Sequence, residues 1–280
     1  MTSTGTEGQG AQQETIDALN ATFWDELCGT TLARHAGITD DSPESLRRFD
    51  AEYLRFYPYL ERYLPTASRA GSALEIGLGY GTVSQLLAER FRDYRGLDIA
   101  AGPVSMVRHR LAMLGVEDTT VRVLQGSALA IPHADEMFDF VCTIGCLHHT
   151  GDLPRAVAEL RRVLRPGGEL LVMLYNSHSL RQVSMRVRET ARRRPGTEAR
   201  ARARYDLNSA GEAAPTTEFV SVRQARRLFG FCRELRIEKQ NFDGYAFRVR
   251  GLPAVRLPRE RLLSTAGRLA GLDLYISGRR

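Results

Sequence analysis

Short apolar runs alternate with amphipathic segments along the middle of the chain. The apolar runs predict five strands, at 72–77, 94–98, 120–125, 138–143 and 169–175. The amphipathic segments between them predict helices at about 81–92, 101–115 and 152–165. Because short αβ units of this kind build a parallel sheet with helices on both faces, the pattern predicts an α/β fold.

Helical patterns precede this alternation. Residues 14–30 predict one helix, and a second opens at Ser42-Pro43, with Ser42 as the N-cap and Pro43 at the first helical position. The first 13 residues are polar and glycine-rich, and we expect them to be disordered. The chain therefore divides into a disordered N-terminus (1–13), a helical region (14–66) and an α/β domain (67–280).

The pattern changes after residue 176. An arginine-rich stretch at 180–205 has helical propensity with a break at Pro195-Gly196, and we assign it to a helical insertion at about 180–215. A short helix at 221–229 and strands at 233–241 and 272–278 follow. Just before the fifth strand, Arg165-Pro-Gly-Gly168 predicts a sharp helix stop and turn.

The composition is ordinary for a globular protein. The 280 residues are 43% hydrophobic and 26% charged, enough to bury the core of one domain with an appendage. Lys239 is the only lysine, so arginine carries nearly all of the positive charge, and the net charge of +6 weakly favours anionic partners. A GC-rich coding sequence explains the same arginine bias without any function.

The sequence has no recognisable targeting signal and no cysteine spacing typical of a disulfide framework or a metal site. No apolar run reaches membrane-spanning length, and the start lacks the basic and apolar regions of a secretory signal. The four cysteines are scattered, which favours reduced thiols, and we expect no metal site. We therefore expect a cytoplasmic protein without a membrane partner, and a homodimer is compatible with the sequence.

The candidate chemistry starts at a glycine-rich turn. Gly77, Gly79 and Gly81 follow the first predicted strand, and glycine lets a backbone pass very close to a ligand. Asp98 ends the next strand, where a carboxylate accepts hydrogen bonds from ribose hydroxyls. Thr82 occupies the place of the third glycine of a nicotinamide fingerprint, which disfavours that cofactor. An ordinary strand-turn-helix without a ligand is the alternative.

The run Glu75-x-Gly77-x-Gly79-x-Gly81 resembles the first motif of the class I S-adenosylmethionine (SAM) dependent methyltransferases. Leu147-His-His-Thr150 and Arg162-Val-Leu-Arg-Pro-Gly-Gly168 resemble the small-molecule branch of this family, and the resemblance is close over residues 72–176. It implies a Rossmann-like, doubly wound, seven-stranded sheet of order 3-2-1-4-5-7-6 with strand 7 antiparallel. It also implies SAM as the cofactor and S-adenosylhomocysteine as the product.

The resemblance assigns the cofactor site residue by residue. Glu75 is placed near the amino group of the cofactor, Asp98 at its ribose, and Ser127 with Ala128 at the adenine edge, although many members have an acid in place of Ser127. The full cofactor set is Glu75, Gly77, Gly79, Gly81, Asp98, Ile99, Ser127, Ala128 and Ile144. Candidates for the substrate pocket are Trp24, Tyr57, Tyr175 and His178.

Two features have a functional and a structural interpretation. His148 and His149 are candidate general bases because histidine titrates near neutrality, but the pair also occurs in members with different substrates, which favours a structural role. The aromatic residues of the N-terminal helices, such as Trp24 and Tyr57, either form core or belong to a lid that excludes water.

The sequence as a whole predicts methyl transfer from SAM to a small molecule, a specialised metabolite in our interpretation, by in-line displacement. An anionic acceptor would fit the positive charge. A nucleic-acid-binding methyltransferase that uses the arginine-rich insertion is one alternative, but the insertion lacks interleaved aromatic residues. A SAM-binding scaffold without activity and a methylation-triggered cyclisation are the others.

Overall fold

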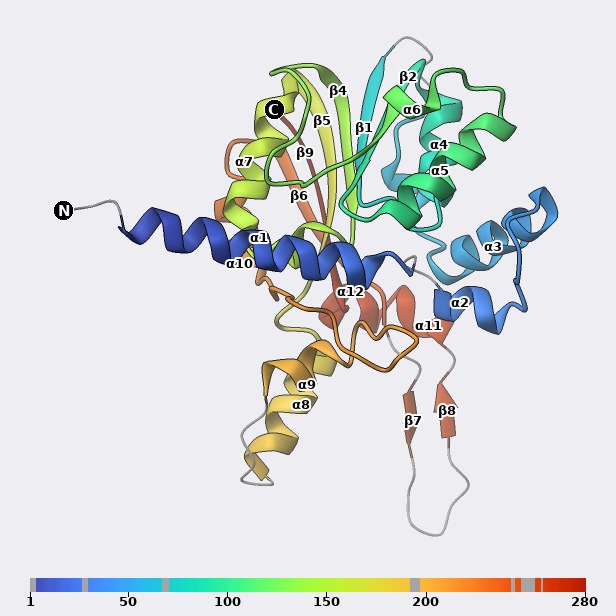
Figure 1. The fold of residues 1–280 in the computed structure, drawn as a ribbon. Coiled ribbons are helices and arrows are strands. Elements are labelled where there is room, and N and C mark those ends of the chain that lie inside the picture. Colours follow the sequence, from blue (N-terminus) through green and yellow to red (C-terminus); the bar gives the residue numbers. More distant parts are fainter. Residues whose placement is uncertain are drawn as a thin grey trace.

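A seven-stranded sheet of order β3-β2-β1-β4-β5-β9-β6 forms the centre of the protein (Figure 1). The computed structural model describes residues 4–26, 30–66, 71–191, 197–242, 245–247, 255–257 and 259–280. The strands of this sheet are β1 (Ser72–Ile76), β2 (Asp93–Asp98), β3 (Val123–Gln125), β4 (Phe138–Ile144), β5 (Leu164–Tyr175), β6 (Arg233–Gln240) and β9 (Asp273–Arg279). Strands β1 to β5 pair in parallel, and β9 is antiparallel to β5 and β6. The strand order implied by the resemblance is confirmed.

Helices cover both faces of the sheet. On one face, α4 (Thr82–Arg90) and α5 (Ala101–Met113) contribute Leu87 and Val107 to an apolar core. On the other face, α7 (Leu153–Val163) and α10 (Val222–Leu228) pack with Val157 and Ala225 in a second core. Burial of a parallel sheet on both faces explains why its strands are continuous apolar runs in the sequence.

Two predicted boundaries differ from the structure. The predicted strand at 120–125 begins as a helical turn, α6 (Thr119–Arg122), because the amide of Arg122 donates to the carbonyl of Asp118. The predicted turn at residues 165–168 is a bulge inside β5, where the register moves from Phe138 opposite Leu164 to Phe140 opposite Glu169. Backbone hydrogen bonds to Arg280 hold this bulge in the sheet, so the chain does not leave it.

The N-terminal segment is a long helix, α1 (Thr4–Trp24), that runs across the carboxyl edge of the sheet (Figure 1). Residues 4–13 therefore belong to this helix, which corrects the expectation of disorder. Side chains tie α1 to the domain, since Gln13 Nε2 donates to Thr150 O (2.8 Å) and Asn20 Nδ2 to His149 O (2.6 Å). These long-range contacts stabilise a helix that composition alone does not predict. The predicted helix at 14–30 ends at Trp24, and its Cys28-Gly29 lie outside the described residues.

Two further helices follow, α2 (Thr30–His35) and α3 (Pro43–Phe56). The predicted N-cap is confirmed, because the Ser42 side chain accepts from the amide of Ser45. Asp50 of α3 forms a bidentate ion pair with Arg110 of α5, with N–O distances of 2.9 and 3.0 Å, and accepts a hydrogen bond of 2.6 Å from Thr82 at the start of α4. The Arg110 side chain is 1% exposed. This pair therefore fixes α3 against the two helices that follow the glycine-rich loop.

The remaining elements lie beyond the fifth strand or connect the others. They are η1 (Glu61–Tyr63), η2 (Leu147–His149), α8 (Leu180–Ala191), α9 (Glu198–Arg202), β7 (Tyr245–Phe247), β8 (Val255–Leu257), α11 (Arg259–Leu263) and α12 (Ala266–Ala270). Helices α8 and α9 and the β7–β8 hairpin project away from the sheet (Figure 1). The predicted break at Pro195-Gly196 lies outside the described residues. No described helix is long and apolar enough to cross a membrane.

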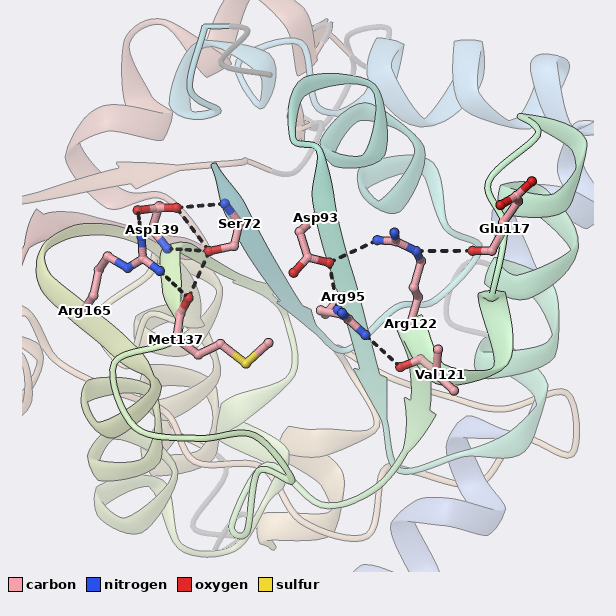
Figure 2. A network of polar contacts seen from close by, with 9 residues as sticks. All are labelled: Ser72, Asp93, Arg95, Glu117, Val121, Arg122, Met137, Asp139 and Arg165. Atoms are coloured by element: carbon pink, nitrogen blue, oxygen red, sulfur yellow. Dashed lines mark hydrogen bonds and ion pairs between the residues drawn. The ribbon is translucent and has the colours of Figure 1, made fainter. Parts of the chain in front are cut away.

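The amino edge of the sheet is held by ion pairs (Figure 2). Asp139 of β4 accepts from the first amide of β1 (2.8 Å) and from Arg165 of β5 (2.6 Å). Asp93 of β2 accepts from Arg95 (2.8 Å) and from Arg122 (3.0 Å). These charges are paired with one another at the edge opposite to the glycine-rich loop. We therefore infer that they align neighbouring strands and do not bind a ligand.

We predict that Asp50→Ala destabilises the protein by about 3–5 kcal/mol, because it leaves the buried guanidinium of Arg110 without its counter-charge. Glu52→Ala removes an exposed ion pair with Arg55 on the same helix and should cost less than about 1 kcal/mol. Urea denaturation of both variants measures the difference. Equal and small losses would mean that Arg110 does not depend on Asp50.

Candidate functional site

A pocket lies at the carboxyl edge of the sheet and encloses about 990 Å³ of space, part of which is open to solvent. Its walls are the loops that follow β1, β2, β3 and β4, together with side chains from α1 and α3. Open α/β sheets bind their ligands at this edge because the loops after parallel strands meet there. All nine residues predicted for the cofactor line this one cavity.

The glycine-rich loop needs its glycines for conformation and for packing. Gly77, Gly79 and Gly81 have φ angles of 82°, 51° and 81°, in the left-handed region that side chains disfavour. A Cβ atom on Gly77 would lie 2.4 Å from the Cβ of Cys146, in the loop after β4. The loop therefore lies directly against its neighbour and presents backbone to the cavity.

Asp98, at the end of β2, joins two of the cavity loops. Its Oδ2 accepts from the amide of Leu78 (2.7 Å) and its Oδ1 accepts from the amide of Ala100 (2.9 Å). Burial raises the pKa of the carboxyl, and the backbone hydrogen bonds oppose that rise. A carboxylate has about four acceptor sites, so Asp98 can hold the loops and still receive a hydroxyl group of a ligand.

Glu75, in the middle of β1, is a buried acid in the wall of the cavity. The hydroxyl of Tyr94 donates to its Oε2 over 2.6 Å. Burial raises the pKa of Glu75 to about 8, so the group is largely protonated at neutral pH. A cationic ligand in the cavity would favour the ionised form and lower this pKa.

The ends of the third and fourth strands complete the predicted cofactor wall. Ser127 and Ala128 follow β3, and Ile144 ends β4. The Ser127 hydroxyl oxygen accepts from the amide of Leu129 (3.2 Å), which leaves its hydrogen free to donate to a ligand. Ser127 therefore has a local structural role and a donor for the cavity.

The two histidines lie in different environments. His149 lines the cavity, but its Nδ1 lies 2.8 Å from Thr216 O and its Nε2 lies 3.6 Å from Asp206 Oδ2. Both ring nitrogens thus face the segment after α9. His148 is fully buried outside the cavity lining, and burial lowers its pKa well below the ordinary value. The geometry favours structural roles, and the catalytic assignment stays a prediction.

The predicted substrate residues are only partly brought together. Trp24 lines the cavity and packs against His149, with ring centroids 4.8 Å apart. Tyr57, Tyr175 and His178 are not among the lining residues. Tyr57 packs in an aromatic cluster of α3, the Tyr175 hydroxyl donates to Asp206, and His178 is exposed beside Ser177.

Residues that the sequence did not single out also line the cavity. From α1 they are Asp17 and Asn20, and from α3 and the glycine-rich loop they are Phe49 and Tyr80, whereas Tyr53, which also lines the cavity, is one of the aromatic residues considered for a lid. The Oδ1 of Asn20 is buried without a hydrogen-bond partner, so it offers an acceptor to a ligand. The sequence could not assign these residues, because helical spacing does not reveal what a helix packs against.

Comparison with known proteins agrees with this geometry. Residues 74–172 match a family described as a methyltransferase domain. The chain is 31% identical over 141 residues to a fatty-acid O-methyltransferase of Mycolicibacterium smegmatis, covering 48% of the chain and 49% of that protein. The chain therefore contains a class I methyltransferase domain.

Other relatives match the same part of the methyltransferase domain. A 2-phytyl-1,4-naphthoquinone methyltransferase of Thermosynechococcus vestitus is 37% identical over 109 residues, covering 38% of the chain and 46% of that protein. The chain spans about half the length of the curated relatives it matches. The fold resembles that of geranyl diphosphate C-methyltransferase of Streptomyces coelicolor A3(2), solved with Mg²⁺, geranyl diphosphate and S-adenosylhomocysteine. The TM-score is 0.51 at 15% identity, covering 86% of each chain.

The cavity of the methyltransferase domain is acidic although the chain is basic. Its lining carries three carboxyl groups, Asp17, Glu75 and Asp98, and neither lysine nor arginine. The net charge of the chain therefore does not describe its cavity. Within the described residues, no group of three or more His, Cys, Asp or Glu side chains is arranged to hold a metal ion.

Asp98→Ala should weaken SAM binding by about 1–3 kcal/mol, roughly 5- to 150-fold in Kd, because ribose hydroxyls and two loop amides lose their acceptor. Isothermal titration calorimetry measures the change. Asp93→Ala, at the other end of the same strand, removes a carboxylate far from the cavity and should leave the affinity unchanged. Unaltered binding by Asp98→Ala would remove this carboxylate from the site.

Glu75→Gln should make the protein more stable than the parent at high pH. The folded-state pKa of about 8 lies above the ordinary value of 4.5, so stability from protonated Glu75 is complete below pH 4.5 and is lost as pH rises through 8. The free energy of unfolding of the variant minus that of the parent should rise over this window, by the order of a few kcal/mol, and then level off. Urea denaturation from pH 5 to about 9 follows it, and a difference independent of pH would contradict the assigned pKa.

Proposed function

We propose that the protein transfers a methyl group from SAM to a small-molecule acceptor by in-line displacement. The observation that carries the proposal is the single cavity in which the glycine-rich loop, Asp98 and the turn at Ser127 converge. SAM carries its methyl group on a sulfonium, so the protein must mainly hold the nucleophile, the methyl carbon and the sulfur in line. That task requires a closed and shaped cavity more than a particular catalytic side chain.

The helical region supplies the closure in this proposal. Trp24 of α1 and Phe49 and Tyr53 of α3 form an aromatic side of the cavity, and the Asp50–Arg110 pair fixes α3 in place. A wall of this kind excludes water from the reacting groups and gives an apolar acceptor a surface to bind. The relative named for a phytyl-naphthoquinone supports an acceptor with a large apolar part.

We further propose that the acceptor is a neutral or cationic specialised metabolite. The cavity lining holds three carboxyl groups and neither lysine nor arginine, so an anionic group placed there would meet ionised carboxylate without a permanent positive charge to offset it. This differs from the anionic acceptor that the net charge of the chain favours. Within this proposal an acceptor nucleophile that is already unprotonated needs no general base, and Nδ1 of His149 is already hydrogen-bonded to Thr216 O.

Calorimetric titration with SAM and with S-adenosylhomocysteine tests the cofactor first. We expect micromolar binding of both, and the Asp98→Ala variant serves as the control. Incubation with methyl-labelled SAM and a panel of neutral amines, phenols and carboxylates then tests transfer, and we expect label in an amine or a phenol. Labelling confined to carboxylates would refute the acceptor class, and no cofactor binding by the folded protein would refute the function.

A further inference from the structure

Helix α8 has a buried face and an opposite face that is apolar and exposed. Gln182 and Met185 point into the protein and are 5% and 7% exposed. Leu180, Val183 and Val187 are 37%, 42% and 63% exposed. The three exposed residues have the spacing i, i+3, i+7, so they form one stripe on the side of the helix away from the protein. We call these three residues the α8 stripe.

Arginines flank the α8 stripe on both sides. At 100° per residue, Arg186 falls on one side of the stripe, and Arg181 and Arg188 fall on the other. Hydrogen bonds to backbone carbonyls hold two of these side chains, since Arg186 donates to Ser177 O and Arg181 to Arg204 O. The flanking charges are therefore placed by the fold.

The neighbouring helix adds to this charge. In the described residues 180–191 and 197–204 there are six arginines (Arg181, Arg186, Arg188, Arg200, Arg202, Arg204) and two glutamates (Glu189, Glu198), a net charge of +4. Helices α8 and α9 project from the carboxyl edge of the sheet, the edge that holds the cavity (Figure 1). An exposed apolar stripe between cations thus lies at the same edge of the sheet as the cavity.

We propose that α8 docks on an anionic lipid surface, with the α8 stripe in the headgroup boundary and the exposed Arg186 and Arg188 at lipid phosphates. Apolar burial and attraction to anionic lipids together drive the binding of such interfacial helices. A nucleic acid would use the arginines but would leave the α8 stripe in water, and α8 and α9 offer no aromatic side chain for stacking bases. Lipid is therefore the occupant that uses both features.

This contact is peripheral, because three aliphatic side chains on a short helix give weak and reversible binding. It departs from the expectation of a protein without a membrane partner, which rested on the lack of a spanning segment. Docking itself does not depend on methyl transfer. If the proposed function also holds, docking would bring the cavity close to acceptors that are dissolved in lipid, and this consequence rests on the proposed function.

Co-sedimentation with phosphatidylcholine vesicles, with and without phosphatidylglycerol, tests the proposal. The protein should sediment with the anionic vesicles, less so at high salt, and stay in solution with the neutral ones. The triple variant Leu180→Ser/Val183→Ser/Val187→Ser should lose binding by at least about tenfold. Leu269→Ser, which changes a leucine of α12 that is 77% exposed, is the matched control and should bind normally. A second variant, Arg188→Gln/Arg200→Gln, should also bind less.

Several results would overturn the proposal. Folded protein that ignores anionic vesicles, or a triple serine variant that binds as the parent does, would do so. A dimer in light scattering that the triple variant abolishes would assign the α8 stripe to an interface between two copies. Circular dichroism and a cooperative thermal transition check that every variant is folded, and SAM titration is measured separately. Vesicle binding without any SAM binding would refute the proposed function and leave the docking intact.

Discussion

The carboxylate of Asp98 is the contact on which the architecture of the cavity depends. The loops after β1 and β2 leave backbone amides without partners at the end of a parallel sheet, and Asp98 accepts from one amide of each loop. An unpaired buried amide costs about as much as a lost hydrogen bond, so the carboxylate stabilises both loops together. The glycines allow this arrangement, because the loop at Gly77 lies too close to Cys146 for a side chain.

A second acid, Asp50, attaches the helical region to the domain in a similar way. Asp50 receives two hydrogen bonds from a buried arginine of α5 and one from Thr82, the first residue of α4. The helix that bears Phe49 and Tyr53 is thereby attached to the helix that begins at the glycine-rich loop. A shift of the loop would be transmitted to α3 through this buried pair, which couples the floor of the cavity to its aromatic wall.

The sequence predicted the features that are encoded locally. The apolar runs located the strands, Ser42-Pro43 located the start of α3, and the glycines with Asp98 located the cavity. The strand order came from the resemblance and not from periodicity, because pairing depends on contacts far apart in the chain. For the same reason the sequence missed the helical start of α1, whose attachment through Asn20 is a contact over 129 positions, and the role of Asp50.

The separation of charge within the molecule explains why its net charge is a poor guide to its ligand. The positive charge is carried by arginines of the surface and the projecting helices, whereas the cavity lining holds Asp17, Glu75 and Asp98. The buried carboxyl of Glu75, with a pKa of about 8, is largely protonated at neutral pH, and a sulfonium or ammonium group beside it would favour its ionised form. In the proposed reaction the sulfonium charge disappears with the methyl group, and the Coulombic attraction of the lining for that part of the ligand disappears with it. The acidic wall thus distinguishes the two forms of the cofactor by charge, while the basic exterior remains available for a different, anionic partner.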